Sequence, residues 1–327
     1  MLPFILKRLI NLIPVFIGAT ALAFFIVQAA PGDFLDTRRV DPRSKPETIT
    51  RLETHFGLDK PVPVQYAIWL GNLVGGDLGT SFDFDRPVIE VIAPRIANSL
   101  LLVVGNIILL WLLAIPLGVY GAVRQYSLGD KTLSFGSYIF LGFPSFFLGL
   151  IVVYLLLQFK FATGNLIFPL GGMTSAGNEN FSPIKQILDV LWHSVAPILT
   201  LTIIGVAGLS RFMRGQMLEF LDADFVRTAK AKGLSQRAVV YKHALRNALL
   251  PFVANIGGIL PALVGGAGFV EQVFNWPGIT PLLLASVNSQ DLYVFLGLIA
   301  LTLVLLIFGN LISDLLLAVV DPRVRFE

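Results

Sequence analysis

Asp224–Pro251 reads DFVRTAKAKGLSQRAVVYKHALRNALLP, and this charged stretch lies between apolar runs that are long enough to cross a bilayer. Phe220–Lys232 is rich in helix-forming residues, and Gly233 follows where a glycine can end a helix with a positive φ. Ser235 can then cap a second helix that runs to about Leu250. The stretch therefore predicts a helix, a glycine bend and a second helix at the water edge of a membrane protein.

The composition of the whole chain agrees with a membrane protein. Of its 327 residues, 55% are hydrophobic and 14% are charged, whereas a soluble domain is usually about 25% charged. The net charge of +3 is too small to indicate a nucleic-acid partner. The sequence has no cysteine, which excludes disulfides and thiolate chemistry.

Apolar runs of spanning length predict an all-α polytopic protein with six membrane helices. The predicted spans are about Leu9–Gln28, Ser99–Val123, Ser134–Gln158, Val195–Met213, Leu249–Val270 and Leu292–Val320. The first run resembles a signal peptide, but its apolar part is longer than the usual region of about 7–15 residues. We expect a retained span, with cleavage after Ala29–Ala30 as the alternative.

Lysine and arginine predict that both termini are cytoplasmic, because the short external loops then carry only Lys160 and Lys185. The predicted divisions are residues 1–30 (cytoplasmic end and first span), 31–97 (external segment), 98–320 (five-helix core with cytoplasmic helices at 215–248) and 321–327 (cytoplasmic tail).

The external segment should contain a helix that starts near Ser44 and another over Pro63–Leu73, stopped by Gly75–Gly76. We expect Trp69 and Phe82 to rest at the membrane interface. The segment could cap a pore or only pack against the helix ends. Pro183–Trp192 should form a separate short helix before the fourth span.

Catalytic signatures are missing from the sequence. It has no G-x-x-x-x-G-K-[ST] phosphate-binding loop and no H-E-x-x-H, and its three histidines are widely spaced. We therefore expect no catalytic residues, no metal site and no directly bound cofactor. Arg211 and Arg214 are most simply interfacial anchors, and Asp314 in the last span serves either gating or a structural hydrogen bond.

Asp224–Pro251 resembles the cytoplasmic coupling motif of ABC importer permeases, and more narrowly that of the dipeptide/oligopeptide/nickel group. Further similar stretches follow in the same order along nearly the whole chain. They are PGD (31–33), FGLDKPVPVQYAIWLGNLVGGDLGTSF (Phe56–Phe82), FNWPGI (Phe274–Ile279), NLISDLL (Asn310–Leu316) and DPRVR (321–325).

The resemblance implies a type I ABC importer transmembrane fold, and the long segment after the first span is similar to that of the first of two permeases. It further implies a non-catalytic subunit that imports di- or oligopeptides through a bacterial or archaeal inner membrane. The implied partners are a second homologous permease, two cytoplasmic ATPases that use ATP–Mg, an external substrate-binding protein and membrane lipid.

The resemblance also assigns site residues. The coupling residues would be Asp224, Arg227, Thr228, Ala229, Lys232, Gly233 and Leu234. The family's Glu-Ala-Ala is replaced here by Arg227, Thr228 and Ala229, so that only Ala229 and Gly233 carry over directly. Ala229, Gly233 and Leu234 would form the contact, and the basic residues either add charge complementarity or form a solvated face.

Polar residues in the spans are candidates for the translocation path, although hydrogen bonding between helices explains each as well. They are Asn106, Asn255, Gln272, Asn310 and Asp314.

Rival hypotheses remain at the level of the sequence. Nickel, glutathione, oligosaccharides or antimicrobial peptides are alternative cargoes for the same class. A self-sufficient channel or ion-coupled carrier would need a polar pore or intramembrane carboxylates, of which only Asp314 is available. A membrane scaffold would explain the spans but not the ordered matches.

Overall fold

The computed structural model describes the backbone of residues 2–29, 35, 39, 49–50, 53–54, 57–254 and 267–320, with side chains except at 2–9, 11 and 313–320. In this part of the chain the structure is helical, and the only β-type pairing is an isolated bridge between Thr80 and Pro87. The named helices are α1 (Leu2–Ala29), α4 (Val62–Val74), α5 (Val88–Val123), α6 (Leu128–Leu141), α7 (Ser145–Thr163), η1 (Asn178–Asn180), α8 (Pro183–Leu221), α9 (Asp224–Ala231), α10 (Gln236–Ala238), η2 (Val239–Ala244), α11 (Leu245–Ala248), α12 (Leu250–Ala254), α14 (Phe269–Val273), α15 (Ile279–Asn288) and α16 (Leu292–Val320).

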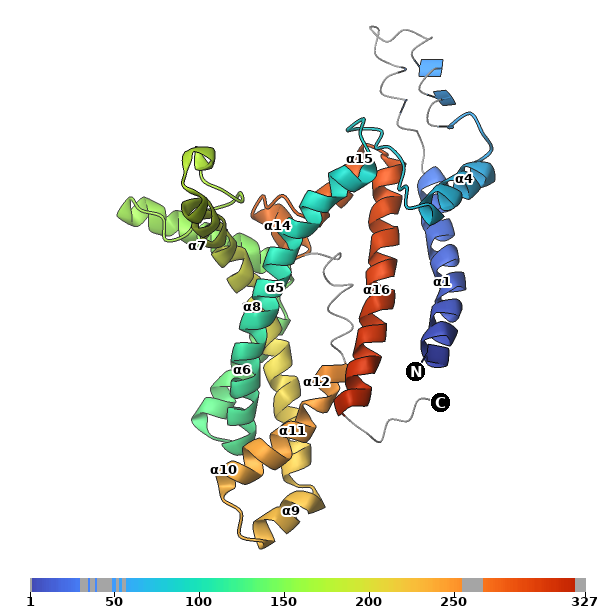
Figure 1. The fold of residues 1–327 in the computed structure, drawn as a ribbon. Coiled ribbons are helices and arrows are strands. Elements are labelled where there is room, and N and C mark those ends of the chain that lie inside the picture. Colours follow the sequence, from blue (N-terminus) through green and yellow to red (C-terminus); the bar gives the residue numbers. More distant parts are fainter. Residues whose placement is uncertain are drawn as a thin grey trace.

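Long helices run between two ends of the molecule (Figure 1). The helices α5 and α8 pack along each other on one side, and α1 packs on α16 on the other. The helices α4 and α15 lie at the upper end, whereas α9, α10 and α11 lie at the lower end. Close packing of α5 on α8 depends on Gly118, because a Cβ there would come within 2.6 Å of the Met213 Cβ and of the Ser210 carbonyl oxygen.

Among the described residues, five helices are long and apolar enough to cross a membrane. They are Leu12–Ala29, Val88–Val123, Ser145–Thr163, Pro183–Leu221 and Leu292–Ile312. The predicted span Leu249–Val270 lies largely outside the described residues, which contain only its ends in α12 and α14.

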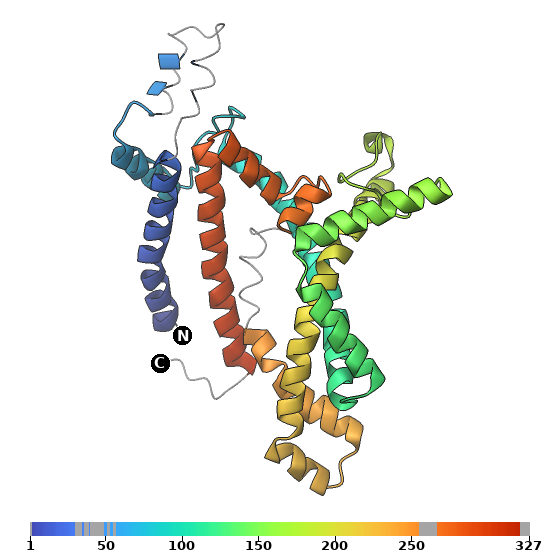
Figure 2. The same ribbon diagram turned by 180° about the vertical axis from the view of Figure 1, so that it is seen from behind.

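The predicted third span, Ser134–Gln158, is wrong as a single helix. The chain forms α6 and then α7, with a break at Gly142–Pro144. Pro144 lacks an N–H and disfavours helical backbone at Phe143, so the first helix ends and a new one starts. The helix α7 consequently points away from α6 (Figure 2).

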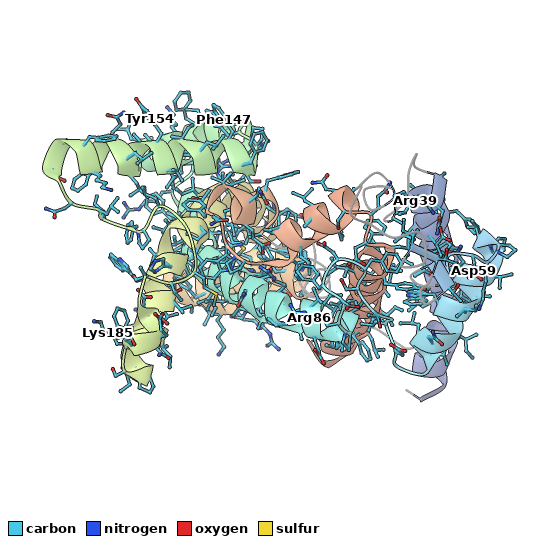
Figure 3. All side chains as sticks on the ribbon, turned by 90° about the horizontal axis from the view of Figure 1, so that it is seen from above. Arg39, Asp59, Arg86, Phe147, Tyr154 and Lys185 are labelled. Carbon is cyan, nitrogen blue, oxygen red and sulfur yellow. The ribbon has the colours of Figure 1, made fainter. Side chains whose placement is uncertain are left out.

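The predicted separation of Pro183–Trp192 from the fourth span is also wrong. These residues are the first turns of α8, which continues without interruption for 39 residues past Pro197. Seen from above, α7 with Phe147 and Tyr154, and the start of α8 with Lys185, extend away from Asp59 and α1 (Figure 3).

The external segment is anchored by aromatic side chains. The predicted Pro63–Leu73 helix is confirmed as α4, and Gly76 follows it with a φ of +84°. The predicted helix near Ser44 lies outside the described residues. Trp69 and Phe82 are 1% and 3% exposed, because they pack with Phe24 of α1 and Leu296 of α16. Both side chains therefore face the protein interior, and their predicted place at the membrane interface stays a prediction.

Candidate functional site

The predicted helix–bend–helix is confirmed at the lower end of the molecule (Figure 1), and we call residues 224–248 the elbow. The first helix starts at Asp224 rather than Phe220, because α8 ends at Leu221 and the chain turns before α9. The second helix starts after Ser235, whose hydroxyl accepts a hydrogen bond from the Ala238 N–H at 3.3 Å. Val239–Ala244 adopts π-helical geometry within this second helix.

Gly233 makes the bend between the two helices. Its φ is +78°, and its N–H donates to the Lys230 carbonyl while the Leu234 N–H donates to the Ala229 carbonyl. These two bonds are the pair expected when a glycine ends a helix in the left-handed conformation. Asp224 in the first turn of α9 and Lys230 in its last turn suit the helix dipole.

One face of the elbow is buried against the ends of α5 and α8. Val226 and Val239 are fully buried, as are Met213 and Met217 of α8. Ala229 is 5% exposed and belongs to the same apolar cluster. The expectation that the Ala229 methyl would contact a partner is therefore corrected: the small side chain lets α9 pack closely on the elbow's own core.

The opposite face of the elbow is open. The remaining predicted coupling residues are all exposed: Asp224, Arg227, Thr228, Lys232, Gly233 and Leu234. Leu234 is a large apolar side chain that is 42% exposed at the bend, and a Cβ at Gly233 would meet no atom within 4 Å. Arg227 lies 3.4 Å from Asp224, but both side chains are solvated, so this pair contributes little to stability.

A salt bridge that sequence reasoning missed joins α6 to α8 above the elbow. Arg214 donates to both carboxylate oxygens of Asp130, at 2.6 and 2.8 Å, and the Tyr126 N–H donates to the same carboxylate at 2.9 Å. The Asp130 side chain is 4% exposed and that of Arg214 is 25% exposed. The hydrogen bonds from Arg214 lower the pKa of Asp130 despite its burial. Arg214 is thus a structural partner within the protein rather than a simple interfacial anchor.

A second missed group is the fully buried Glu271 in α14. Its carboxylate accepts hydrogen bonds from the Ser99 hydroxyl at 2.5 Å, the Thr280 N–H at 2.8 Å and the Ala267 N–H at 3.3 Å. Gly278 packs so closely on this carboxylate that any side chain there would collide with it. A lone acidic residue in an apolar run beside FNWPGI was the signal in the sequence.

The same turn is held to α5 by a second set of bonds. The Trp276 indole N–H donates to the Asn98 carbonyl at 3.0 Å, and the Asn98 amide donates to the Pro277 carbonyl at 2.8 Å. The FNWPGI stretch therefore fastens the α14–α15 hairpin to α5.

The polar residues predicted for a translocation path are not brought together in the described part of the structure. The Asn106 side-chain carbonyl accepts from the Thr202 hydroxyl at 3.0 Å, which is a helix–helix bond between α5 and α8. Gln272 and Asn310 are exposed on α14 and α16. Asn255 and the side chain of Asp314 lie outside the described residues. Within the described residues, no three His, Asp or Glu side chains gather as metal ligands.

Comparisons with known proteins cover the whole chain. Residues 114–326 match the family described as binding-protein-dependent transport system inner membrane component, and residues 1–103 match its N-terminal region. The chain is 39% identical over 328 residues to the oligopeptide transport system permease protein AppB of Bacillus subtilis, with 100% of both chains covered. It is 35% identical over 341 residues to the dipeptide transport system permease protein DppB of Escherichia coli, also with 100% of both covered. It is 32% identical over 323 residues to the oligopeptide transport system permease protein OppB of Mycobacterium bovis, with 98% of each covered.

These matches extend over the elbow, the FNWPGI turn and the external segment alike, and one of them is a family match over more than half of the chain. The chain therefore belongs to the family of binding-protein-dependent transport system inner membrane components.

Proposed function

We propose that this chain is the peptide-conducting permease subunit of an ATP-driven importer, and that the exposed face of the elbow is where a cytoplasmic ATPase docks. The observation that carries the proposal is the elbow itself: a rigid buried face joined to α8, and an open face around Leu234 and Gly233. Di- or oligopeptides are the proposed cargo, because the relatives are described as dipeptide and oligopeptide permeases.

The proposed assembly contains a second homologous permease that forms the other half of the path, two ATPases that hydrolyse ATP–Mg, and an external binding protein. A lack of a phosphate-binding loop in the sequence supports a separate source of ATP hydrolysis. The start of α1 and the end of α16 lie at the same end as the elbow, opposite α4 (Figure 1), which supports cytoplasmic termini in a bacterial inner membrane.

The elbow suits the transmission of force to the membrane helices. A partner that moves α9 also moves Val226 and Ala229, which pack against Met213 and Met217 of α8. Because α8 is one helix of 39 residues, roughly 58 Å long at the usual rise, it can carry a displacement across the bilayer. The Asp130–Arg214 salt bridge makes α6 follow α8.

A bulky side chain on the open face tests this proposal. Thr228→Trp keeps helical backbone geometry, whereas Gly233→Trp adds bulk and also strains a position with a φ of +78°. Both variants should lower ATP-driven peptide uptake by at least about tenfold, because a loss of about 1.4 kcal/mol of docking energy is tenfold in affinity. Membrane insertion should be unchanged.

Two controls separate docking from folding. Gly233→Ala adds the backbone strain, about 1–2 kcal/mol, without the bulk. Gln125→Trp puts the same bulk on an exposed residue outside the elbow. Normal uptake and normal binding of the ATPases by Thr228→Trp and Gly233→Trp would show that the elbow is not the docking surface.

A further inference from the structure

An apolar groove of about 280 Å³ opens on the lateral surface formed by α5, α6 and α8. Figure 2 shows α6 lying alongside α8 in this region. Its walls include Leu113, Gly136, Phe140, Leu199, Ile203 and Val206. Phe140 and Leu113 are 36% and 41% exposed, so the groove is open to the surroundings of the helices.

Next to the groove lies a smaller hollow of about 80 Å³, lined by two arginines and by Asp130. Leu117, Leu133, Ser137 and Ser210 line both spaces, so the two are adjacent. Arg211, Arg214 and Tyr138 line the smaller space. The apolar groove thus lies beside a hollow that holds two guanidinium groups, towards the end of the molecule that carries the elbow.

The two arginines differ in charge balance. Arg214 is neutralised by Asp130 through two short hydrogen bonds. Arg211 has no carboxylate within ion-pair distance in the described part of the chain, and its guanidinium is held 4.4 Å above the Tyr138 ring. The hollow therefore has an uncompensated positive charge whose N–H donors are free for an anion.

A phospholipid has the complementary chemistry. Lipid tails alone give an apolar groove little selectivity in a membrane, because any tail fills it equally well. An arginine at the end of the groove adds recognition of a phosphate, which a guanidinium binds through paired hydrogen bonds. Basic pockets between membrane helices on the cytoplasmic side are known to hold anionic head groups.

We propose that this groove binds one anionic phospholipid, with an acyl chain between α5, α6 and α8 and the phosphate against Arg211. The lipid occupies the cytoplasmic leaflet if the orientation proposed above holds. It packs against α8 as far as Ser210, about one turn before Met213 of the elbow core.

The test uses the assembled transporter in detergent, incubated with equal amounts of phosphatidylglycerol and phosphatidylcholine that carry the same acyl chains. Lipids that remain after washing are measured by native mass spectrometry. The wild-type complex should be enriched in phosphatidylglycerol. Arg211→Ala should lower the phosphatidylglycerol-to-phosphatidylcholine ratio about fivefold, the change expected for one basic residue near a head group.

A second variant blocks the groove without changing its charge. A Cβ at Gly136 would meet no atom within 4 Å, so the ring of Gly136→Phe can enter the groove, and retention of both lipids should fall. Gly215→Phe is the matched control, because Gly215 is an exposed helical glycine with equally free space outside the groove. Arg124→Ala controls for the loss of one exposed arginine that also lies over a tyrosine ring, at 5.6 Å from Tyr120.

Three results would overturn the proposal. The first is an unchanged lipid ratio in Arg211→Ala, and the second is unchanged retention in Gly136→Phe. The third comes from a photoreactive cross-linker attached to Gly136→Cys, which should cross-link to a phospholipid. A cross-link to a protein subunit would instead assign the groove to a subunit interface.

Discussion

Single residues decide how the elbow end of this permease is built. Gly233 lets the chain turn between α9 and α10, and Ala229 lets α9 pack closely on the elbow core. The Asp130–Arg214 salt bridge joins the start of α6 to α8. Each of these acts through shape or a local hydrogen bond, so each can be changed without altering the apolar spans.

The Asp130–Arg214 salt bridge gives a pH prediction. Its hydrogen bonds lower the folded-state pKa of Asp130, so the stabilisation is full above the unfolded-state pKa of about 3.9 and is lost as the pH falls through the folded value. Asp130→Asn should therefore lower the free energy of unfolding by roughly 1–2 kcal/mol, and by the same amount at about pH 5 and about pH 8.

Thermal unfolding of the purified complex at several pH values measures this difference. Asp222→Asn is the control, because Asp222 is exposed at the end of α8. A difference between wild type and Asp130→Asn that shrinks from pH 8 to pH 5 would mean that Asp130 titrates in that range, contrary to the geometry.

At the scale of elements, short segments between the long helices carry much of the architecture. The break at Pro144 redirects α7, and the FNWPGI turn ties the α14–α15 hairpin to α5. Asp291 ties the start of α16 to the segment before α5. Its carboxylate accepts hydrogen bonds from the Val294 N–H, the Ser81 hydroxyl and the Asp83 N–H. These turns determine how neighbouring spans are spaced.

Glu271→Gln should loosen the α14–α15 hairpin. The carboxylate accepts from three donors with its two oxygens, whereas a glutamine amide has one oxygen and adds a donor facing the Thr280 or Ala267 N–H. An unsatisfied buried donor costs roughly 1–3 kcal/mol.

Hydrogen–deuterium exchange at Ile279 and Thr280 should accelerate accordingly, while Gln272→Ala on the exposed neighbour should leave exchange unchanged. Wild-type exchange in Glu271→Gln would refute this role for the carboxylate.

For the whole molecule, the two ends of the helix assembly differ in chemistry. The upper end holds α4 against α1 and α16 through buried aromatic side chains, and the lower end presents the open face of the elbow (Figure 1). The sequence has no phosphate-binding loop, and the open face of the elbow is the proposed docking surface for a separate ATPase.

We therefore expect this chain alone in liposomes to move no peptide, with or without an ion gradient. The complete complex with ATPases, binding protein and ATP should import peptides into the same liposomes. Uptake of radiolabelled dipeptide measures both cases. Import by the chain alone under an ion gradient would instead indicate an ion-coupled carrier.

Many features of this protein were determined by local sequence. Apolar runs of sufficient length specify membrane helices because lipid offers no partner for free backbone groups. Gly233 and Ser235 specify the bend and the next helix start because those residues satisfy backbone geometry within a few positions.

Tertiary structure alone decided which surfaces those helices present. Hydropathy could not show that Trp69 and Phe82 are interior, that Ala229 faces inward, or that Glu271 is fully buried, because burial depends on neighbours far away in the chain. Asp130 and Arg214 lie 84 positions apart, and only the packing of α6 on α8 brings them together. Local rules govern backbone hydrogen bonds within a segment, whereas contacts between segments are set by how close their side chains allow them to approach.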